Sequence, residues 1–399
     1  MTSLGTAVTY EQLTWPVADE AGYGVADQRA ALRQSGPYDA AVPAEIADLR
    51  LDLPPGVLAE AEDAAAELAR FDAELGTEIA PFTAILLRSE AASSSNIENL
   101  TASARAIAEA EVLVGTHRRN AGLIVANVNA MRAAVDLSDD VDAGAILAMH
   151  RALMESSDPA TAGRWRKEQV WIGGGPFGPR GADFIAPHHA RVPGAVDDLV
   201  DFARRRDLPV VPQVAIAHAQ FETIHPFPDG NGRTGRALLQ AMLRYQRLTR
   251  RITVPVSAGL LADTEGYFSA LHAYREGDAA PIVSTVSAAS LHAVANGRRL
   301  VDDLRGVRAG WRELITARSD SAIHRVADHL LIRPVFDAAL LNRELGIRTG
   351  NARRYVDPLV EAGIVVEFTD RARNRAWRAP EVLAALDDFA ERAGRRRLP

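Results

Sequence analysis

The chain has 399 residues, of which 47% are apolar, so it can bury a large core spread over two or three domains. Its formal charge of −7 argues against the whole chain acting as a non-specific nucleic-acid binder. It has no cysteine, which excludes disulfides, thiolate zinc sites and thiol catalysis. No stretch approaches the roughly 18 apolar residues of a membrane span, and no basic segment precedes an apolar run at the N-terminus, so we expect a cytoplasmic protein that does not enter a membrane.

The first hundred residues read as a loop-rich segment followed by two helices. Prolines punctuate residues 1 to about 55, which we therefore predict to be rich in loops and where we find no candidate chemistry. Residues 56–75 and 81–99 show helical spacing of apolar residues. The second helix ends in the run Ser93-Ser94-Ser95-Asn96-Ile97-Glu98-Asn99. Serines are weak helix formers, so on physical grounds alone this run is best explained as a solvated helix C-terminus.

Residues 101–135 and 142–156 are again predicted to be helical, and we interpret His150 as a histidine satisfied within its helix rather than as a ligand. Two β-prone runs, at Gln169–Gly173 and Ala182–Pro187, flank a turn rich in glycine and proline. This pattern predicts a β-hairpin within residues 163–190. His188 and His189 have no third ligand at a metal-binding spacing, so we place them in a loop. Residues 192–207 resume as a helix.

The most informative stretch is the loop that follows the next helix. Pro212 to Ile224 reads as a helix, which Pro226 and Pro228 then end, and a second helix begins after Gly232. His218 in the first of these helices is interpreted like His150, as a satisfied core histidine. The sequence therefore places His225 and Asp229 on a short glycine-rich loop between two helices.

This loop has the features of an anion-binding site. Glycines allow close approach of the backbone, and a helix N-terminus directs unpaired N–H groups outward. Arg233 and Arg236 share one face of the first turn, where each cation opposes the helix dipole at a cost of about 0.3–1 kcal/mol. A polyphosphate would offset that cost, Asp229 would supply an oxygen ligand for Mg²⁺, and His225 would accept a proton. We therefore predict phosphoryl or nucleotidyl transfer.

The glycine spacing of this loop is compatible at first sight with three different structures. Gly230-x-Gly232-x-x-Gly235 matches a dinucleotide fingerprint, but a helix rather than a strand precedes it. An EF-hand is excluded because Arg233 and Thr234 stand where a ligand and a turn glycine are needed. A plain helix corner with a structural histidine stays open.

The chain then continues with helices at residues 263–275 and 279–300, the first with an aromatic stripe that is typical of a core. Residues 301–399 hold 18 Arg against 15 Asp plus Glu. A helix at 349–362 followed by strands at 364–368 and 376–378 resembles a winged helix. Its arginines are candidates for phosphate contacts, and the alternative is a winged helix used for protein contact or dimerisation. These arginines are Arg348, Arg353, Arg354, Arg371, Arg373 and Arg375.

The run from His225 to Arg236 resembles the signature of Fic-domain proteins, His-Pro-Phe-x-(Asp/Glu)-Gly-Asn-Gly-Arg-x-x-Arg, at every defining position. The resemblance covers about residues 80–290. It implies AMPylation, the transfer of AMP from ATP to a Ser, Thr or Tyr hydroxyl of a target protein. It also implies that His225 deprotonates the hydroxyl, that Asp229 holds Mg²⁺ or Mn²⁺, and that Arg233 and Arg236 hold the β- and γ-phosphates. The other nucleotide-binding residues implied in the loop are Gly230, Asn231, Gly232, Thr234 and Gly235.

The same resemblance implies roles outside the signature. Ser94-x-x-x-Glu98-Asn99 resembles the inhibitory motif Ser/Thr-x-x-x-Glu-Gly/Asn, in which Glu98 would pair with Arg236 in the place of the γ-phosphate. Its position before the signature matches the subclass with an N-terminal inhibitory helix. The predicted hairpin would be the flap that holds the target by strand addition. Val170, Trp171, Ile172 and Gly173 would lie beside the nucleotide, and Tyr267 would lie near the adenine.

We therefore expect a mainly α protein. Its parts would be an N-terminal helical region with the inhibitory helix (1–115), a Fic-type helical core with a β-hairpin flap (116–300) and a C-terminal winged helix-turn-helix domain (301–399). The expected function is protein adenylyl transfer held in check by Glu98. The alternatives are a DNA-binding regulator whose core senses nucleotide, and a hydrolase that removes AMP from a target. A homodimer, the target and the preferred nucleotide stay open.

Overall fold

The structure, a computed structural model, describes residues 5–16, 25–75, 79–113, 119–318, 321–369 and 375–394. It is mainly helical, as predicted, and its residues group into two compact units. Unit 1 comprises Met1–Glu62, Ala133–Gln246 and Glu265–Thr285, and unit 2 comprises Asp63–Arg132, Arg247–Thr264 and Val286–Pro399. The described part of the chain contains no helix that is both long and apolar enough to cross a membrane.

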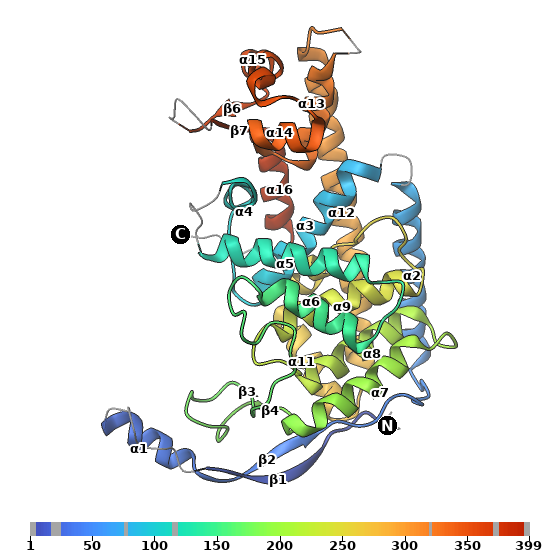
Figure 1. Cartoon of the computed structure of the whole chain (residues 1–399). Helices are drawn as coiled ribbons and strands as arrows, with labels where there is room; N and C mark the ends of the chain where they lie inside the picture. The colour runs from blue at the N-terminus through green and yellow to red at the C-terminus, as the bar shows by residue number, and fades with distance from the viewer. Residues whose placement is uncertain are drawn as a thin grey trace. The chain divides into compact units, whose positions relative to one another are not determined.

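Unit 1 is a helical layer with two small antiparallel sheets (Figure 1). Its strands are β1 (Thr9–Trp15), β2 (Gly36–Val42), β3 (Trp171–Ile172) and β4 (Phe184–Ile185). Its helices are α1 (Val25–Gln34), α6 (Ala143–Met154), η1 (His189–Arg191), α7 (Val192–Arg204), α8 (Val210–Ile224), α9 (Asn231–Tyr245) and almost all of α11 (Thr264–Arg275). Helix α8 packs against α7 and α9 and is buried on every side, as expected for a central helix.

The ribbon formed by β1 and β2 corrects the prediction that the first 55 residues are loop-rich. The two strands pair antiparallel over their whole length, from Thr9 opposite Val42 to Trp15 opposite Gly36. Helix α1 connects them in place of a two-residue turn. Because the sequence signal for a hairpin is a tight turn between two alternating runs, no local pattern marked these strands.

The predicted hairpin is confirmed as β3 and β4, with Trp171 opposite Ile185. It lies beside the ribbon (Figure 1), and a small core of Ala41, Phe184 and Ala186 joins the two. Trp15 Nε1 donates a hydrogen bond of 3.0 Å to the carbonyl of Phe177 in the hairpin turn. The ribbon therefore supports both the strands and the turn of the hairpin.

Unit 2 is built around α3 (Ile79–Ile97), against which α10 (Val256–Ala262) and α13 (Ala322–Ile332) pack. The long helices α2 (Pro55–Glu74), α5 (Arg119–Asp136) and α12 (Ala280–Leu314) have residues in both units. The predicted boundary at residue 300 falls inside α12. The remaining elements of unit 2 are α4 (Ala104–Val112), β5 (Val335–Asp337), α14 (Ala338–Leu345), η2 (Thr349–Asn351), α15 (Ala352–Glu361), β6 (Val366–Glu367), β7 (Ala376–Arg378) and α16 (Pro380–Arg392).

The C-terminal elements follow the order α13, β5, α14, α15, β6, β7, and their three strands form one antiparallel sheet in the order β5-β7-β6. Phe336 of β5 stacks on Trp377 of β7 with ring centroids 5.6 Å apart, which gives this part its own small core. Arg375 pairs with Glu367 at 3.3 Å. Arg371 and Arg373, predicted at the hairpin tip, lie outside the described residues.

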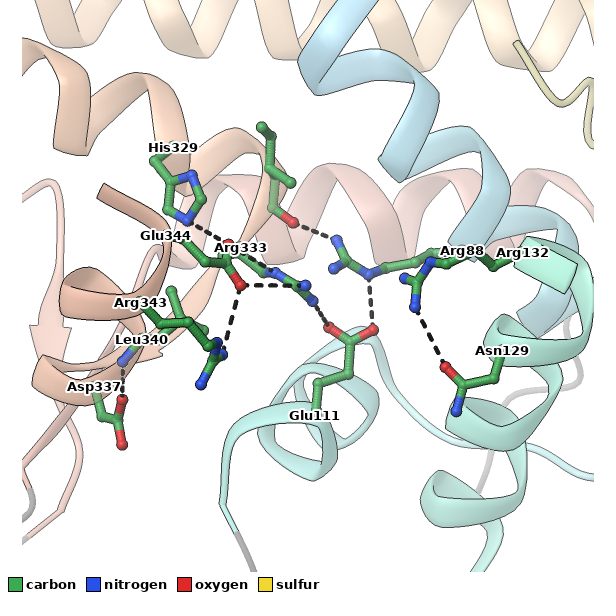
Figure 2. Close-up of polar contacts among 11 residues, drawn as sticks. Arg88, Glu111, Asn129, Arg132, His329, Arg333, Asp337, Leu340, Arg343 and Glu344 are labelled. Atoms are coloured by element: carbon green, nitrogen blue, oxygen red, sulfur yellow. Dashed lines mark hydrogen bonds and ion pairs between the residues drawn. The ribbon is translucent and has the colours of Figure 1, made fainter. Parts of the chain in front are cut away.

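A chain of charged side chains joins α3 and α4 to α13 and α14 (Figure 2). Glu111 accepts hydrogen bonds of 2.8 Å from Arg88 Nε and from Arg333 Nη1, and Arg333 Nη2 lies 3.4 Å from Glu344. His329 Nε2 lies 3.0 Å from the second oxygen of Glu344. The Glu111 side chain is only 8% exposed, so its charge is stabilised by these two arginines rather than by water.

Candidate functional site

The loop predicted to bind an anion lies between α8 and α9, where the backbone takes two left-handed residues. His225 ends α8 with φ 50° and ψ 60°, and its N–H donates to the carbonyl of Phe221 at 2.9 Å. Gly230 precedes α9 with φ 78°, and a Cβ added there would lie 3.0 Å from Leu153 Cδ2. Glycine is therefore required at Gly230 for its conformation and for space, and the loop is a sharp turn of fixed shape.

Asn231 fixes that shape from inside the loop. Its Oδ1 accepts from the N–H of Phe227 at 2.9 Å, and its Nδ2 donates to the carbonyl of Phe227 at 2.8 Å. Both ends of the amide are thus engaged with the loop backbone. Any contact of Asn231 with a phosphate would come from its backbone N–H, which is the first of α9 and has no acceptor within the helix.

His150 supports the other side of the loop from α6. Its Nδ1 accepts from the N–H of Gly163 at 3.0 Å, its Nε2 lies 3.1 Å from the carbonyl of Asp229, and its ring stacks on Phe227 at 3.6 Å. Burial lowers the pKa of His150 to about 4, so the ring is neutral and Nε2 carries the proton. The prediction of a satisfied histidine is confirmed, and the backbone of Asp229 is what it holds.

The arginines of the signature lie in the first turns of α9. Arg233 is 6% exposed and Arg236 is 1% exposed, and Arg233 Nη2 lies 3.6 Å from Asp229 Oδ1. Two buried cations at the positive end of a helix oppose its dipole, so the site favours the approach of an anion with several charges. Arg233 and Arg236 therefore add two buried positive charges to the first turns of α9.

Asp229 is the exposed member of the loop. Its side chain is 71% exposed, and its Oδ1 accepts from the N–H of Gly230 at 2.6 Å. The described residues contain no group of three or more His, Asp or Glu side chains arranged to hold a metal. Asp229 nevertheless fits Mg²⁺ when a nucleotide is bound, because that ion takes one or two carboxylates and completes its shell with phosphate oxygens and water.

Thr234 and Gly235 face the protein rather than the loop. Thr234 is fully buried, and a Cβ added to Gly235 would lie 2.6 Å from Glu222 Oε1 and 2.8 Å from Phe221 Cδ1. These two signature residues therefore allow α9 to pack closely on α8. Their packing holds the helix that carries the arginines, and their role in nucleotide binding stays a prediction.

The segment at the end of α3 that is predicted to be inhibitory differs from the solvated helix end that its composition predicts. Ser93, Ser94 and Ser95 are all buried. Ser95 Oγ donates to the carbonyl of Ala91 at 2.8 Å and accepts from Asn127 Nδ2 at 3.1 Å. The serines are therefore packing residues of α3, and their small size lets neighbouring helices approach.

Glu98 and Asn99 form the cap of α3. Asn99 has φ 60°, its N–H bonds to the carbonyl of Asn96 at 2.9 Å, and the N–H of Leu100 bonds to that of Ser95 at 3.0 Å. This pair of bonds is a Schellman motif, which requires a left-handed residue that Gly or Asn supplies. The motif therefore has Gly or Asn at this position because the helix cap needs a left-handed residue there. Glu98, just before it, is exposed at the end of the capped helix.

The residues predicted beside the nucleotide occupy the hairpin. Trp171 lies edge-on to Trp15 at 5.2 Å, and Ile172 is 38% exposed. Gly173 has φ 74°, and a Cβ there would lie 2.2 Å from Asp183 Oδ2. Val170 packs against the small core of the ribbon and the hairpin. The strand β3 has a hydrogen-bonded neighbour on one side only, among the strands described.

Tyr267, predicted near the adenine, lies in the core, and its contact with adenine stays a prediction. Tyr267 is 1% exposed, and its hydroxyl lies 2.7 Å from His218 Nε2. Burial lowers the pKa of His218 to about 3, so this pair is a neutral core contact. The aromatic stripe of α11 faces the core, as its spacing predicts, while Phe268 beside it is 52% exposed.

One residue of the site was missed altogether. Arg166 is 3% exposed and donates to the backbone carbonyl of His225 at 2.8 Å. It lies in the run Gly163-Arg164-Trp165-Arg166, where a second arginine two positions earlier is exposed. Nothing in the local pattern separates these two arginines.

Comparisons with known proteins agree with this geometry. Residues 140–243 match the model of the Fic/DOC family. The protein adenylyltransferase fic-1 of Caenorhabditis elegans is 30% identical over 152 residues, which are 37% of this chain and 27% of that protein. A probable protein adenylyltransferase of Aquifex aeolicus (strain VF5) is 38% identical over 126 residues, which are 28% of this chain and 36% of that protein. The chain thus matches about a quarter to a third of the length of these relatives.

A solved structure extends the likeness of the fold. A Fic family protein from Desulfovibrio desulfuricans G20 superposes with a TM-score of 0.52 at 23% identity. The superposition covers 82% of this chain and 97% of the other. At this identity the likeness concerns the arrangement of the helices and leaves the chemistry to the residues of the site.

Proposed function

Because the chain belongs to the Fic family, we propose that it is a protein adenylyltransferase that transfers AMP from MgATP to a hydroxyl side chain of a target protein. The observation that carries the proposal is the α8–α9 loop. It combines a histidine with a fixed backbone, an exposed carboxylate and two buried arginines at a helix N-terminus. Relatives named as protein adenylyltransferases support the reaction at the level of the family.

In this reaction His225 takes the proton of the target hydroxyl as its oxygen attacks the α-phosphorus. A P–O bond forms to the target, the bond between the α-phosphorus and the bridging oxygen breaks, and pyrophosphate leaves. Asp229 would hold the Mg²⁺ ion, which neutralises charge on the phosphates. Arg233, Arg236 and the first N–H groups of α9, including those of Asn231 and Gly232, would bind the β- and γ-phosphates.

The target would bind along the β3–β4 hairpin. An extended segment can add to the open side of β3 by backbone hydrogen bonds, which places its hydroxyl without selecting strongly for sequence. Val170, Trp171, Ile172 and Gly173 form this edge. Because binding of this kind depends on the backbone of the target, the sequence of the enzyme does not identify the target protein.

We further propose that Glu98 restrains the enzyme. It is exposed at a helix end that the Asn99 cap fixes, so its carboxylate is presented on a rigid support. Pairing of Glu98 with Arg236 would take the place of the γ-phosphate and leave ATP in an unproductive pose. Ser94, buried in the same helix, would hold the packing of α3 that this pairing needs.

Labelled-ATP incubation with cell lysate tests both proposals. Glu98→Gly should raise the transfer of AMP above that of the wild type, and the double variant with His225→Ala should abolish it. Asp229→Ala should abolish the transfer of AMP at every concentration of added Mg²⁺. Equal labelling by wild type and Glu98→Gly would remove Glu98 from its regulatory role. Incubation with a protein that already carries AMP shows whether the enzyme also runs the hydrolysis.

A second function is favoured by the C-terminal elements, whose order matches a winged helix. The side chain of Arg353 is 64% exposed on α15, the helix that would enter a major groove, and Arg354 beside it is also exposed. Binding of duplex DNA should fall with salt and weaken in Arg353→Ala and Arg354→Ala. Absence of binding at low salt would leave this part for contact with protein.

A further inference from the structure

We propose that Arg166 is a positioning residue that holds the backbone of His225 and the stem of the β3–β4 hairpin in one arrangement. The inference rests on the proposed function, because the residue it positions is the proposed base. Arg166 lies in the segment between α6 and β3, and it has no counterpart among the signature residues.

The guanidinium of Arg166 is surrounded by backbone carbonyls. Nε donates to His225 at 2.8 Å, and Nη2 donates to Pro187 at 2.5 Å and more weakly to Ile224 at 3.5 Å. Nη1 donates to Glu168 at 2.9 Å. The backbone N–H of Arg166 also donates to the carbonyl of Pro226, at 3.0 Å. A single residue thus binds three consecutive carbonyls of the loop and two from the hairpin stem.

The carbonyls of Ile224 and His225 are those that a helix leaves without partners at its C-terminus. Helix α8 cannot satisfy them by continuing, because Pro226 and Pro228 follow. A cation at this end also meets the negative pole of the helix dipole. Arg166 therefore caps α8, and the cap falls on the residue that carries the proposed base.

Burial of Arg166 carries a desolvation cost that a role in packing alone would not offset. Arg166 is 3% exposed, and within the described residues no carboxylate forms an ion pair with it. Burial lowers its pKa to about 10, and the protein accepts that desolvation. Only a planar guanidinium carries five donors in fixed directions, so lysine could not reach the same set of carbonyls.

The left-handed backbone of His225 explains why such a clamp is needed. A non-glycine residue in this conformation is strained, and neighbouring contacts must hold it there. The backbone of His225 sets the direction of its imidazole. Since the same guanidinium also binds Glu168 before β3 and Pro187 after β4, it fixes the base relative to the strand that would hold the target hydroxyl.

Kinetics in the Glu98→Gly background test this role. Arg166→Met should lower kcat by a hundredfold or more at saturating ATP and target, while the KM for ATP changes by less than threefold. Arg166→Lys keeps the charge and should recover part of kcat, and Arg166→Gln should not. Arg164→Met is the matched control, because Arg164 is exposed two residues away, and it should leave kcat unchanged. A kcat for Arg166→Met within threefold of its parent overturns the proposal.

Hydrogen exchange of the full chain, read by mass spectrometry, tests the same clamp without any activity. Arg166→Lys should speed exchange together at residues 224–232 and at 168–173 and 184–189, whereas Arg164→Met should not. Faster exchange in the hairpin alone would overturn the link to His225. If the parent transfers no AMP, the proposed function fails, and the exchange experiment still decides whether Arg166 joins the two segments.

Discussion

The charge network of Figure 2 makes a sharp prediction for the substitution Glu111→Gln. The Glu111 carboxylate is 8% exposed and accepts 2.8 Å hydrogen bonds from two guanidiniums, those of Arg88 and Arg333. Arg88 also donates to the carbonyl of Ile332, and its side chain is 13% exposed. An amide in place of the carboxylate leaves two cations facing each other with no anion between them.

The magnitude follows from the number and kind of bonds lost. A hydrogen bond to a charged group contributes about 1.5–3 kcal/mol, and removing one partner of a buried ion pair costs about 3–5 kcal/mol. We expect Glu111→Gln to lower the free energy of unfolding by about 4 kcal/mol, measured by urea denaturation of the whole chain. Adding Arg88→Met should recover part of this loss, because it removes the guanidinium that Glu111→Gln leaves without a carboxylate, whereas Arg333 keeps its contact with Glu344.

Glu109→Gln on the same helix is the matched control. Glu109 pairs with Arg105 at 2.6 Å, but the arginine side chain is 50% exposed. Exposed pairs of this kind contribute about 0.3–0.5 kcal/mol, so the control should stay close to the wild type. A loss for Glu111→Gln no larger than that of Glu109→Gln would show that water, and not the two arginines, stabilises Glu111.

Three further predictions centre on unit 1. The free energy of unfolding should fall as the pH decreases from about 6.5 towards 4. The folded pKa values of His150 (about 4) and His218 (about 3) lie below the ordinary value, so over this range only the unfolded chain binds those protons. His150→Gln should reduce the slope of that fall, measured by urea titrations, by about 1.4 kcal/mol per pH unit. Gly235→Ala should destabilise by about 1–3 kcal/mol through its collision with Glu222 and Phe221, whereas Gly306→Ala, which meets open space within α12, should stabilise by about 0.5–1 kcal/mol in thermal melts. Arg180→Ala removes the hydrogen bonds from Arg180 to the carbonyls of Arg33 and Ser35. It should raise the KM for the protein target by about tenfold and leave the KM for ATP unchanged. Arg33→Ala keeps its carbonyl and is the control, so an equal rise in both variants would contradict a role of the ribbon in holding the hairpin.

The sequence predicted the elements whose signals are local. The helices on either side of the loop, the hairpin between its two β-prone runs and the core histidines all follow from spacing, turn residues and burial. The loop between α8 and α9 was predictable for the same reason, since its prolines and glycines dictate where each helix ends and begins. What the sequence could assign was therefore the position of the loop and of its flanking helices, while the chemistry of the loop stays a prediction.

The missed features depend on contacts between distant segments. The ribbon joins strands on either side of a helix, and the buried Ser93 looked exposed because polar composition alone does not report which helices cover a surface. Arg166 differs from Arg164 only in what lies around it, namely carbonyls about 20 to 60 positions away. Tyr267 packs inward and contacts His218, which the spacing of the aromatic stripe predicts, whereas its adenine contact stays a prediction of the resemblance.

The site divides its residues by burial, and this division bears on how the enzyme would be controlled. His150, Asn231 and Arg166 are buried, and each of them bonds a backbone group of the loop rather than a ligand. The shape of the loop is thus stabilised within the fold and does not depend on what is bound. The two carboxylates proposed to meet the nucleotide or to replace its γ-phosphate, Asp229 and Glu98, are exposed instead. Under the proposed function, control would therefore act by exchange of carboxylates and phosphates on the buried arginines, without any rearrangement of the base.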